Sequence, residues 1–288
     1  MRKLFISALS AAAILMLFPV DASAGLFCSK KSKTLKVMSY NIRVGKAKDN
    51  DNSWQYRQRA SIEMIEDIAP DVFGLQECLD FQRAYLEENL PDYAGVGVGR
   101  DDGSQAGEQM CVFYNKKNVK LVKWGTFWLS ETPEVPSKSW DAAYPRTATW
   151  ALLKDTRNGK KFYFVNTHLD HKGAEARAKG LSLIVDRIKS FNPEGYPMVL
   201  LGDFNVTPDD PCLKSLVGRM NSARDTAPIT DHQITFNGWG NPDHDAPIDY
   251  IYWKGFERAS KFRVVTEEYG RKYVSDHYPI ISTLVFKK

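Results

Sequence analysis

Short runs of apolar, β-branched and aromatic residues recur along the chain, and turn-forming residues bound most of them. Runs of this kind are typical of β-strands. They are LKVMSY, DVFGLQ, MCVFYN, TATWALL, KFYFVNTHL, MVLLGD, IDYIYW and YPIISTLVF. Because the runs begin near residue 35 and continue almost to the end without a linker or repeat, we expect residues 35–288 to form a single domain.

Apolar residues in two of the intervening segments follow the spacing of one helix face. These residues are Ile62, Ile65 and Ile68 in the first segment, and Leu181, Ile184, Val185 and Ile188 in the second. Strands and helices alternate early in the chain, whereas the later strands follow one another more directly. This order favours an α/β fold with mixed sheets covered by helices over a purely parallel, doubly wound sheet.

Two polar intervals, residues 43–57 and 129–146, interrupt the pattern and are predicted to be long loops. Long loops in compact domains are usually functional or disordered. Trp54 and Trp140 lie within them. Each tryptophan could stack on a substrate or anchor its loop to the body of the domain.

The first 24 residues are typical of a secretory signal peptide rather than part of the fold. Arg2 and Lys3 precede an apolar stretch, and Ala22–Ala24 forms a small-x-small cleavage site. We therefore expect export across the bacterial inner membrane, to the periplasm or the outside, with residues 25–34 as a short polar tail. A membrane anchor and lipid attachment through Cys28 are the alternatives. No later segment is apolar enough to cross a membrane.

Composition limits the function classes only weakly. The 288 residues are 43% hydrophobic, enough for a sizeable core, and carry a net charge of +4. That charge neither requires nor excludes nucleic acid as a partner. The four cysteines are widely spaced, so a structural zinc site is not expected, and the sequence does not choose among possible disulfide pairings.

Polar side chains with metal-binding or acid–base chemistry stand at the ends of many predicted strands. In the run VLLGDFN, for example, an apolar strand ends in Asp203 and Asn205. A sheet scaffold can gather such side chains rigidly into one cleft. The others are Asn41, Glu77, His168, Asp170, Asp249, Asp276 and His277.

Oxygen-rich sets of this kind suit Mg²⁺, which binds through one or two carboxylates, several waters and a substrate phosphate. Attack on a phosphate ester needs a deprotonated water and stabilisation of the charge on the phosphoryl oxygens. Carboxylates can orient or deprotonate the water, while histidinium and amide groups can stabilise that charge. The residue set therefore indicates hydrolysis of a phosphate ester with Mg²⁺, or Mn²⁺, as cofactor.

The segments YNIR, LQE, GEQMCVFY, PRTATW, NTHLDH, GDFN, IDYI and SDHYP occur in this order over residues 35–286. Together they resemble the endonuclease/exonuclease/phosphatase superfamily of metal-dependent hydrolases, and most of all its secreted bacterial branch. The resemblance implies a four-layer α/β sandwich, in which two mixed β-sheets pack face to face with helices outside.

The resemblance also implies roles for individual residues on the metal side. Glu77 resembles the main metal carboxylate, with Asn41 beside the metal or its water. Asp276 resembles a second carboxylate on that side. Asp203 resembles the residue that deprotonates the attacking water, and Asn205 helps to hold water or phosphate.

On the phosphate side, His277 resembles a histidine that contacts the scissile phosphate, with Asp249 as its orienting partner. His168 resembles a second phosphate-side histidine, with Glu108 as its partner. A carboxylate partner fixes the tautomer of a histidine and favours its charged form. Arg146 resembles a phosphate-contacting arginine.

Asp170 and His171 follow His168 directly and have two interpretations. They either line the site or cap the helix that follows.

Fold and metal site do not fix the substrate in this superfamily. Extracellular nucleic acid, a phospholipid headgroup and a small phosphodiester or phosphomonoester all stay open. The expected function is that of a secreted phosphoesterase, with a nuclease or a sphingomyelinase-like phospholipid hydrolase as alternatives and an inactive binding module as the least favoured. No stable protein partner is implied.

Overall fold

The computed structural model describes residues 33–243 and 245–288, and these lie within one compact unit, Ser32–Lys288. Its first sheet contains β1 (Thr34–Asn41), β2 (Val72–Gln76), β3 (Tyr93–Val96), β4 (Val112–Asn115), β11 (Arg258–Val264) and β12 (Ile280–Val285). Its second sheet contains β5 (Val119–Trp128), β6 (Thr147–Asp155), β7 (Lys161–His168), β8 (Met198–Asp203), β9 (Asn221–Ser222) and β10 (Asp249–Lys254). The α-helices are α1 (Trp54–Ile68), α2 (Asp80–Asn89), α3 (Ala174–Phe191) and α4 (Ala223–Thr226), and the 3-10 helices are η1 (Asn50–Asn52), η2 (Pro211–Leu216) and η3 (Gly238–Gly240).

Both sheets are mixed, as predicted. The strand orders are β11-β12-β1-β2-β4-β3 and β5-β6-β7-β8-β10-β9. In each sheet a central pair is parallel, β1 with β2 and β7 with β8, while the other neighbours are antiparallel. Every run of residues that the sequence predicts to be a strand overlaps one of these strands in sequence.

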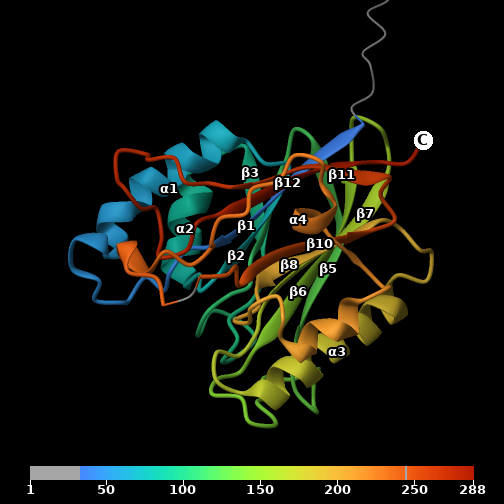
Figure 1. Cartoon of the computed structure of the whole chain (residues 1–288), viewed down its shortest axis with the longest axis horizontal. Helices are drawn as coiled ribbons and strands as arrows, with labels where there is room; N and C mark the ends of the chain where they lie inside the picture. Colours follow the sequence, from blue (N-terminus) through green and yellow to red (C-terminus); the bar gives the residue numbers. More distant parts are fainter. Residues whose placement is uncertain (1–32, 244) are drawn as a thin grey trace, which may run out of the picture. The chain divides into compact units, whose positions relative to one another are not determined.

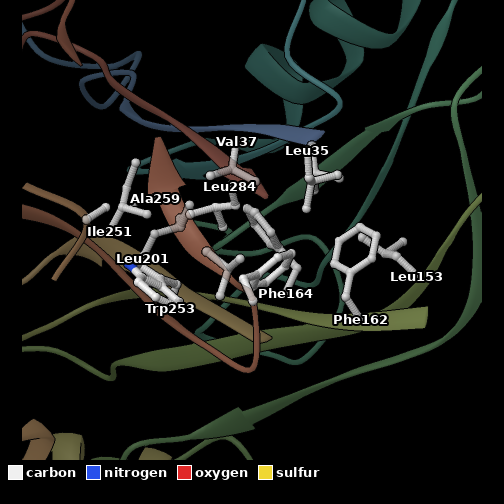
Figure 2. Packing of buried hydrophobic residues seen from close by; sticks show 14 of the residues in the cluster. Leu35, Val37, Leu153, Phe162, Phe164, Leu201, Ile251, Trp253, Ala259 and Leu284 are labelled. Carbon is white, nitrogen blue, oxygen red and sulfur yellow. The ribbon is translucent and has the colours of Figure 1, made fainter. Parts of the chain in front are cut away.

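The two sheets pack face to face through an apolar core (Figure 2). Leu35 and Leu284 of the first sheet meet Phe164, Leu201 and other residues of the second, and all four are fully buried. Alternating positions along each strand supply this core, because successive side chains of a strand point to opposite faces. Burying such residues stabilises the fold by roughly 1.5–3 kcal/mol for each large apolar side chain.

Helices cover the outer face of each sheet, which completes the predicted four layers. Figure 1 shows α1 and α2 on one side and α3 on the other. The predicted helix faces are the buried ones: Ile62 and Ile65 pack on the first sheet, and Leu181 and Ile184 on the second. Asp141 fixes the start of α3, since its carboxylate accepts from the backbone N–H groups of Glu175 and Ala176.

The first predicted loop is shorter than expected, because α1 already begins at Trp54. Trp54 is 5% exposed and makes an edge contact with Tyr85, so it anchors the loop to the body of the domain. The second predicted loop, residues 129–146, contains no helix or strand.

The strand ends converge at one end of the sandwich. Asn41 is paired in register with Gln76 at the end of the parallel strands β1 and β2, and His168 with Asp203 at the end of β7 and β8. Asp249, the first residue of the antiparallel β10, lies opposite Asp203. A hydrogen bond joins the two sheets here, since the side-chain amide nitrogen Asn41 Nδ2 donates to Asp203 Oδ2 across 3.0 Å.

None of the helices in residues 33–243 and 245–288 has the length and apolarity that crossing a membrane requires. Cys78 and Cys111 are fully buried core residues with free thiols, and Cys212 is also buried and free. The predicted signal peptide, Cys28 and most of the predicted tail lie outside the described residues.

Candidate active site

A cleft of about 300 Å³ lies where the strand ends converge. Most of the predicted site residues line it, namely Glu77, Glu108, Arg146, His168, His171, Asp203, Asn205, Asp276 and His277. A larger hollow of about 570 Å³ beside η2 and β10 contains none of them in its lining. Charged and hydrogen-bonding groups therefore concentrate in the smaller cleft, which is the candidate active site.

Backbone strain also concentrates in this cleft. Arg43, Glu77 and Asn205 have positive φ angles of 60°, 60° and 53°, although none is a glycine. Such conformations cost roughly 1–3 kcal/mol each and persist only where surrounding contacts enforce them. Each of the three residues lies one or two positions after the end of a strand. The left-handed backbone conformation there turns their side chains into the cleft.

Gly202 permits the close approach of the strands that carry His168 and Asp203. Its φ is +147°, and a Cβ added to it would lie 1.8 Å from the carbonyl oxygen of Thr167. No larger residue fits between β7 and β8 at this point. The glycine of the GDFN segment is thus a packing requirement for the site.

Asp203 lies at the centre of the cleft, between two histidines. Its Oδ2 is 3.4 Å from His168 Nε2 and 3.7 Å from His277 Nε2, while its Oδ1 accepts from the backbone N–H of Asn205. Burial and the nearby Asp249 carboxylate raise the pKa of Asp203 to about 7. A carboxylate with a pKa near neutrality can accept a proton from water at physiological pH.

His277 and Asp249 form the hydrogen-bonded pair that the sequence predicts. His277 Nδ1 donates to Asp249 Oδ2 across 2.9 Å, and both side chains are buried. Burial opposes a charge on this ring, but Asp249 and Asp203 outweigh it and raise the pKa of His277 well above its usual range. The charged form of the His277 ring is therefore favoured, and its Nε2 lies 3.7 Å from Asp203 Oδ2 in the cleft.

His168 differs from the expectation of a charged ring held by Glu108. Burial, together with Arg146 and Arg100, lowers the pKa of His168 well below its usual range. Glu108 Oε2 is 3.9 Å from His168 Nδ1, too far for a hydrogen bond, and accepts from Arg100 Nη1 at 2.7 Å instead. The structure therefore places Glu108 beside His168, as the sequence predicts, but the hydrogen bond of Glu108 goes to Arg100 rather than to the ring.

Asn205 supplies the hydrogen bond that orients His168. Its Nδ2 lies 2.9 Å from His168 Nε2 and 3.0 Å from the carbonyl oxygen of Leu169. Since the amide nitrogen can only donate, His168 Nε2 is the acceptor and its proton sits on Nδ1. Asn205 thus acts on His168 as well as bordering the cleft.

Asp170 and His171 separate into the two interpretations that the sequence left open. Asp170 is 1% exposed and accepts from the backbone of Lys172 and Gly173, just before α3, and from Arg146 Nε at 3.2 Å. It therefore caps a turn and holds Arg146, and does not line the cleft. His171 does line it, and its Nδ1 lies 3.1 Å from Arg146 Nη2.

The cleft has the donor set that a divalent cation needs. Residues 33–243 and 245–288 contain two groups of three potential ligands, Glu77 with His168 and Asp203, and Asp203 with Asp249 and His277. In the second group, His277 Nδ1 and Asp249 Oδ2 are already hydrogen-bonded to each other at 2.9 Å. In the first, Glu77 is half-buried, and its negative charge contributes to the raised pKa values of Asp203, Glu108 and Asp276 after the effect of burial. A cation at Glu77 would relieve this crowding of carboxylates.

Asn41 and Asp276, both predicted on the metal side, have other contacts in the structure. Asn41 Oδ1 accepts from Arg43 N, and its Nδ2 donates to Glu77 Oε1 and to Asp203 Oδ2. Asn41 therefore positions the two carboxylates rather than presenting its oxygen to a cation. Asp276 lies outside both groups of potential ligands within the described residues, and its Oδ2 is 3.3 Å from Arg43 Nη1.

Six further lining residues were not predicted: Asp243, Ile248, Arg43, Arg100, Tyr144 and Phe236. Arg43 belongs to the YNIR segment, so its position was a usable signal. Arg100 stacks over the ring of Tyr144, which is 53% exposed, and Phe236 makes an edge contact with His277. No strand end marks these last three residues in the sequence, since loops carry them into the cleft.

Comparison with known protein families gives one match that covers most of the chain. Residues 38–277 match the model of the Endonuclease/Exonuclease/phosphatase family. This segment includes every cleft residue described above.

Solved structures of similar proteins have the same fold. A protein named endonuclease/exonuclease/phosphatase from Bacteroides vulgatus is 36% identical with a TM-score of 0.84, and the match covers 89% of this chain and all (100%) of that one. A mannosyl-6-phosphatase from Bacteroides thetaiotaomicron is 33% identical with a TM-score of 0.83, over 88% of this chain and 100% of that one. Among relatives found by sequence, an uncharacterized protein of Acanthamoeba polyphaga mimivirus is 26% identical, over 79% of this chain and 91% of its own length.

Proposed function

Because this chain belongs to the endonuclease/exonuclease/phosphatase family of phosphoric ester hydrolases, we propose that it hydrolyses a phosphate ester by water attack at a centre built around Asp203. The observation that carries this proposal is the position of one Asp203 oxygen, 3.4 Å from a neutral His168 and 3.7 Å from a charged His277. A proton acceptor and a charged donor then face the same small volume, which is what attack on a phosphoryl group requires.

Asp203 is the proposed proton acceptor. With a pKa of about 7, much of the Asp203 carboxyl is ionised at neutral pH. The carboxylate is also basic enough to take the proton of an attacking water. Asn41 Nδ2 at 3.0 Å and the Asn205 N–H at 2.9 Å hold the two carboxylate oxygens in place. The proton therefore moves from water to a carboxylate whose orientation is already fixed.

His277 is the proposed donor to a phosphoryl oxygen. Asp249 orients its ring and keeps it charged, so its Nε2–H carries both a hydrogen and a positive charge into the cleft. Hydrogen bonds from charged donors are roughly twice as strong as neutral ones. The negative charge that grows on the phosphoryl oxygens during attack strengthens this contact further.

Arg146 is the proposed second contact to the phosphate. Asp170 fixes its Nε and His171 receives its Nη2, while its Nη1 is buried and has no acceptor among the residues that the structure describes. A buried donor without an acceptor is costly, typically about 1–3 kcal/mol, so a phosphate oxygen would stabilise it. The side chain is thus preorganised for an anion.

Glu77 is the residue that we propose holds the divalent cation, Mg²⁺ or Mn²⁺, with Asn41 and the Val44 N–H orienting its carboxylate. When bound, such a cation supplies positive charge that lowers the pKa of a nearby water and offsets charge on the phosphate. The contribution of the protein itself is to hold the Glu77 carboxylate in a fixed orientation at the edge of the cleft.

For the substrate, we propose a phosphomonoester of a sugar-like alcohol. The similarity to a mannosyl-6-phosphatase over the whole of that chain supports a sugar phosphate. The cleft of about 300 Å³ is at the lower end of the usual size of ligand sites, which favours a small substrate. The exposed ring of Tyr144 at the rim gives the leaving group an aromatic surface, and this feature would also suit the base of a nucleic acid, which makes a phosphodiesterase the second candidate.

A panel of substrates with the purified protein tests the proposed reaction and separates the two candidates. Mannose 6-phosphate, glucose 6-phosphate, p-nitrophenyl phosphate, bis-p-nitrophenyl phosphate, RNA, DNA and sphingomyelin are compared with Mg²⁺, with Mn²⁺ and with excess chelator. We expect the highest kcat/KM for a hexose phosphate and no turnover with chelator. Faster cleavage of the diesters or nucleic acids would favour the second candidate, and no hydrolysis of any ester would overturn the proposal.

We also propose that the enzyme is exported, on the basis of the basic residues Arg2 and Lys3 and the Ala22–Ala24 segment. Fractionation of a bacterial host that expresses the whole chain should recover a processed protein outside the cytoplasm, with Gly25 at its N-terminus. An unprocessed chain in the cytoplasm would contradict export, and a lipid-modified N-terminus at Cys28 would replace secretion by membrane attachment.

A further inference from the structure

Arg43 occupies a rigid position beside the predicted metal side of the cleft. Its φ of 60° is strained, and hydrogen bonds hold its backbone on both sides. Arg43 N donates to Asn41 Oδ1 at 3.0 Å, and Gln82 Nε2 donates to its carbonyl oxygen at 3.0 Å. The following residue is also fixed, since Val44 N donates to Glu77 Oε2.

The guanidinium group of Arg43 connects two carboxylates. Its Nε and Nη2 bind both oxygens of Asp49, at 2.9 and 3.1 Å, and its Nη1 lies 3.3 Å from Asp276 Oδ2. A two-point arginine–carboxylate contact fixes the plane of the guanidinium as well as its position. The charge near Asp276 therefore belongs to a side chain that is held in place by another residue.

Glu77 contrasts with Asp276 in this respect. Its oxygens accept from two neutral donors, Asn41 Nδ2 and Val44 N, and no salt bridge involves it within the described residues. Asp276 has a guanidinium in direct contact, whereas Arg43 and Arg100 act on the charge of Glu77 only from beyond ion-pair distance. One of these two carboxylates is therefore open to a divalent cation, and the other is already paired.

We propose that Arg43 is a built-in cation that takes the place of a second metal ion, so that the cleft binds one divalent cation, at Glu77, and none at Asp276. This inference rests on the metal dependence in the proposed function. Two-metal hydrolases hold their ions about 3.5–4 Å apart, with carboxylates on both. A second ion at Asp276 would have to displace a guanidinium that Asp49 binds at two points.

Asp276 thereby has a different role from the second metal-side carboxylate that family resemblance implies. It completes, with Asp49, the site that receives Arg43. Arginine suits this position better than lysine, because its planar group can bind Asp49 with two nitrogens and still direct the third to Asp276.

Metal stoichiometry tests the inference without measuring catalysis. Equilibrium dialysis of the purified chain with Mn²⁺, followed by elemental analysis, should give about one ion per chain for the wild type and about two for Arg43→Gln, which exposes Asp276 and Asp49. Arg59→Gln is the matched control, because Arg59 pairs with Glu63 on the surface of α1, and it should bind as the wild type does. Two ions on the wild type, or one on a folded Arg43→Gln variant, would overturn the inference.

A second pair of variants keeps the test decisive if Arg43→Gln does not fold. Asp276→Asn should still bind about one Mn²⁺, whereas Glu77→Gln should bind none. Loss of the ion in Asp276→Asn would overturn the inference. A protein that binds one ion but hydrolyses no phosphate ester would overturn the proposed function and leave this inference intact.

Discussion

Two histidines approach the same oxygen of Asp203 from different sides of the cleft, and their protonation states are opposite. His277 has Asp249 at 2.9 Å, and the carboxylates around it raise its pKa. His168 is equally buried but has Arg146 and Arg100 nearby, and burial together with these charges lowers its pKa. Burial alone disfavours the charged form of either ring.

The difference shows that the neighbouring fixed charges, not burial, decide which histidine is charged. Residue type and strand-end position are the same for both, so neither could assign the roles. The contrast also suits the two rings to distinct proposed functions: His277 would carry charge to the phosphate, whereas His168 would act as a neutral ring that Asn205 holds in place. Single substitutions can test both the charged state of His277 and the neutral state of His168.

Removing each ring in turn should give the largest contrast. We expect His277→Gln to lower kcat by about 10³-fold, because a charged donor to the phosphoryl oxygens is lost. His168→Gln should lower it only about tenfold, the effect of one neutral hydrogen bond. Steady-state kinetics on the best ester of the panel measures both, and equal losses would show that the two rings have the same role.

Removing the partner of His277 should have a smaller effect. Asp249→Asn keeps the shape of the pair but removes the charge that stabilises the imidazolium. The pKa of His277 should fall, and kcat should drop by about 10²-fold at neutral pH. NMR titration of the imidazole signals follows the pKa directly, and an unchanged titration would contradict the assigned partner.

Changing the charge near His168 tests the comparison from the other side. Arg146→Gln removes the first of the cationic neighbours that keep this ring neutral, so the pKa of His168 should rise toward its usual value of about 6.5. The NMR titration of His168 should shift while that of His277 does not. Arg187→Gln, a surface arginine paired with Glu134, is the control for loss of one positive charge.

Asp170→Asn should affect stability more than chemistry. The variant leaves Arg146 buried without its carboxylate, which typically costs about 3 kcal/mol. Burial would raise the pKa of Asp170, but backbone N–H donors and Arg146 lower it well below its usual value. A carboxyl group whose pKa is lowered by folding stabilises the fold above its unfolded pKa of about 3.9. This stabilisation is lost as the pH falls below that value toward the folded pKa. Urea unfolding should therefore show a deficit at pH 7 that shrinks below pH 4, and Asp141→Asn at the start of α3 should show a smaller one.

Much of the fold could be predicted from the sequence, because most strands are buried on both faces of a sandwich and read as apolar runs. The missed strands β3, β5, β9 and β11 are all edge strands, and the exposed faces of β5 and β11 carry lysine, arginine and serine. Polar residues interrupt the alternation of apolar and polar positions along β5 and β11, and Trp124 of β5 is 39% exposed. Helix α2 was missed for a similar reason, since only Gln82 and Leu86 of its residues are buried.

The site could be predicted as a set of residues but not as a set of contacts. Strand ends identified Asp203, Asn205, Glu77 and His277, since sheet register brings such positions together. The pairing of Glu108 with Arg100 depends on a loop whose path no periodic pattern encodes. The neutral state of His168 depends on distances to two arginines that are far from it in the sequence.

The central claim is that Asp203 is the group that activates water for attack on the phosphate ester. Release of inorganic phosphate by Asp203→Asn tests it most directly, with Asp209→Asn as the control, an exposed aspartate on the same segment. We expect Asp203→Asn to lose about 10³-fold or more in kcat while Asp209→Asn keeps wild-type activity. Wild-type activity in a folded Asp203→Asn variant would contradict the account.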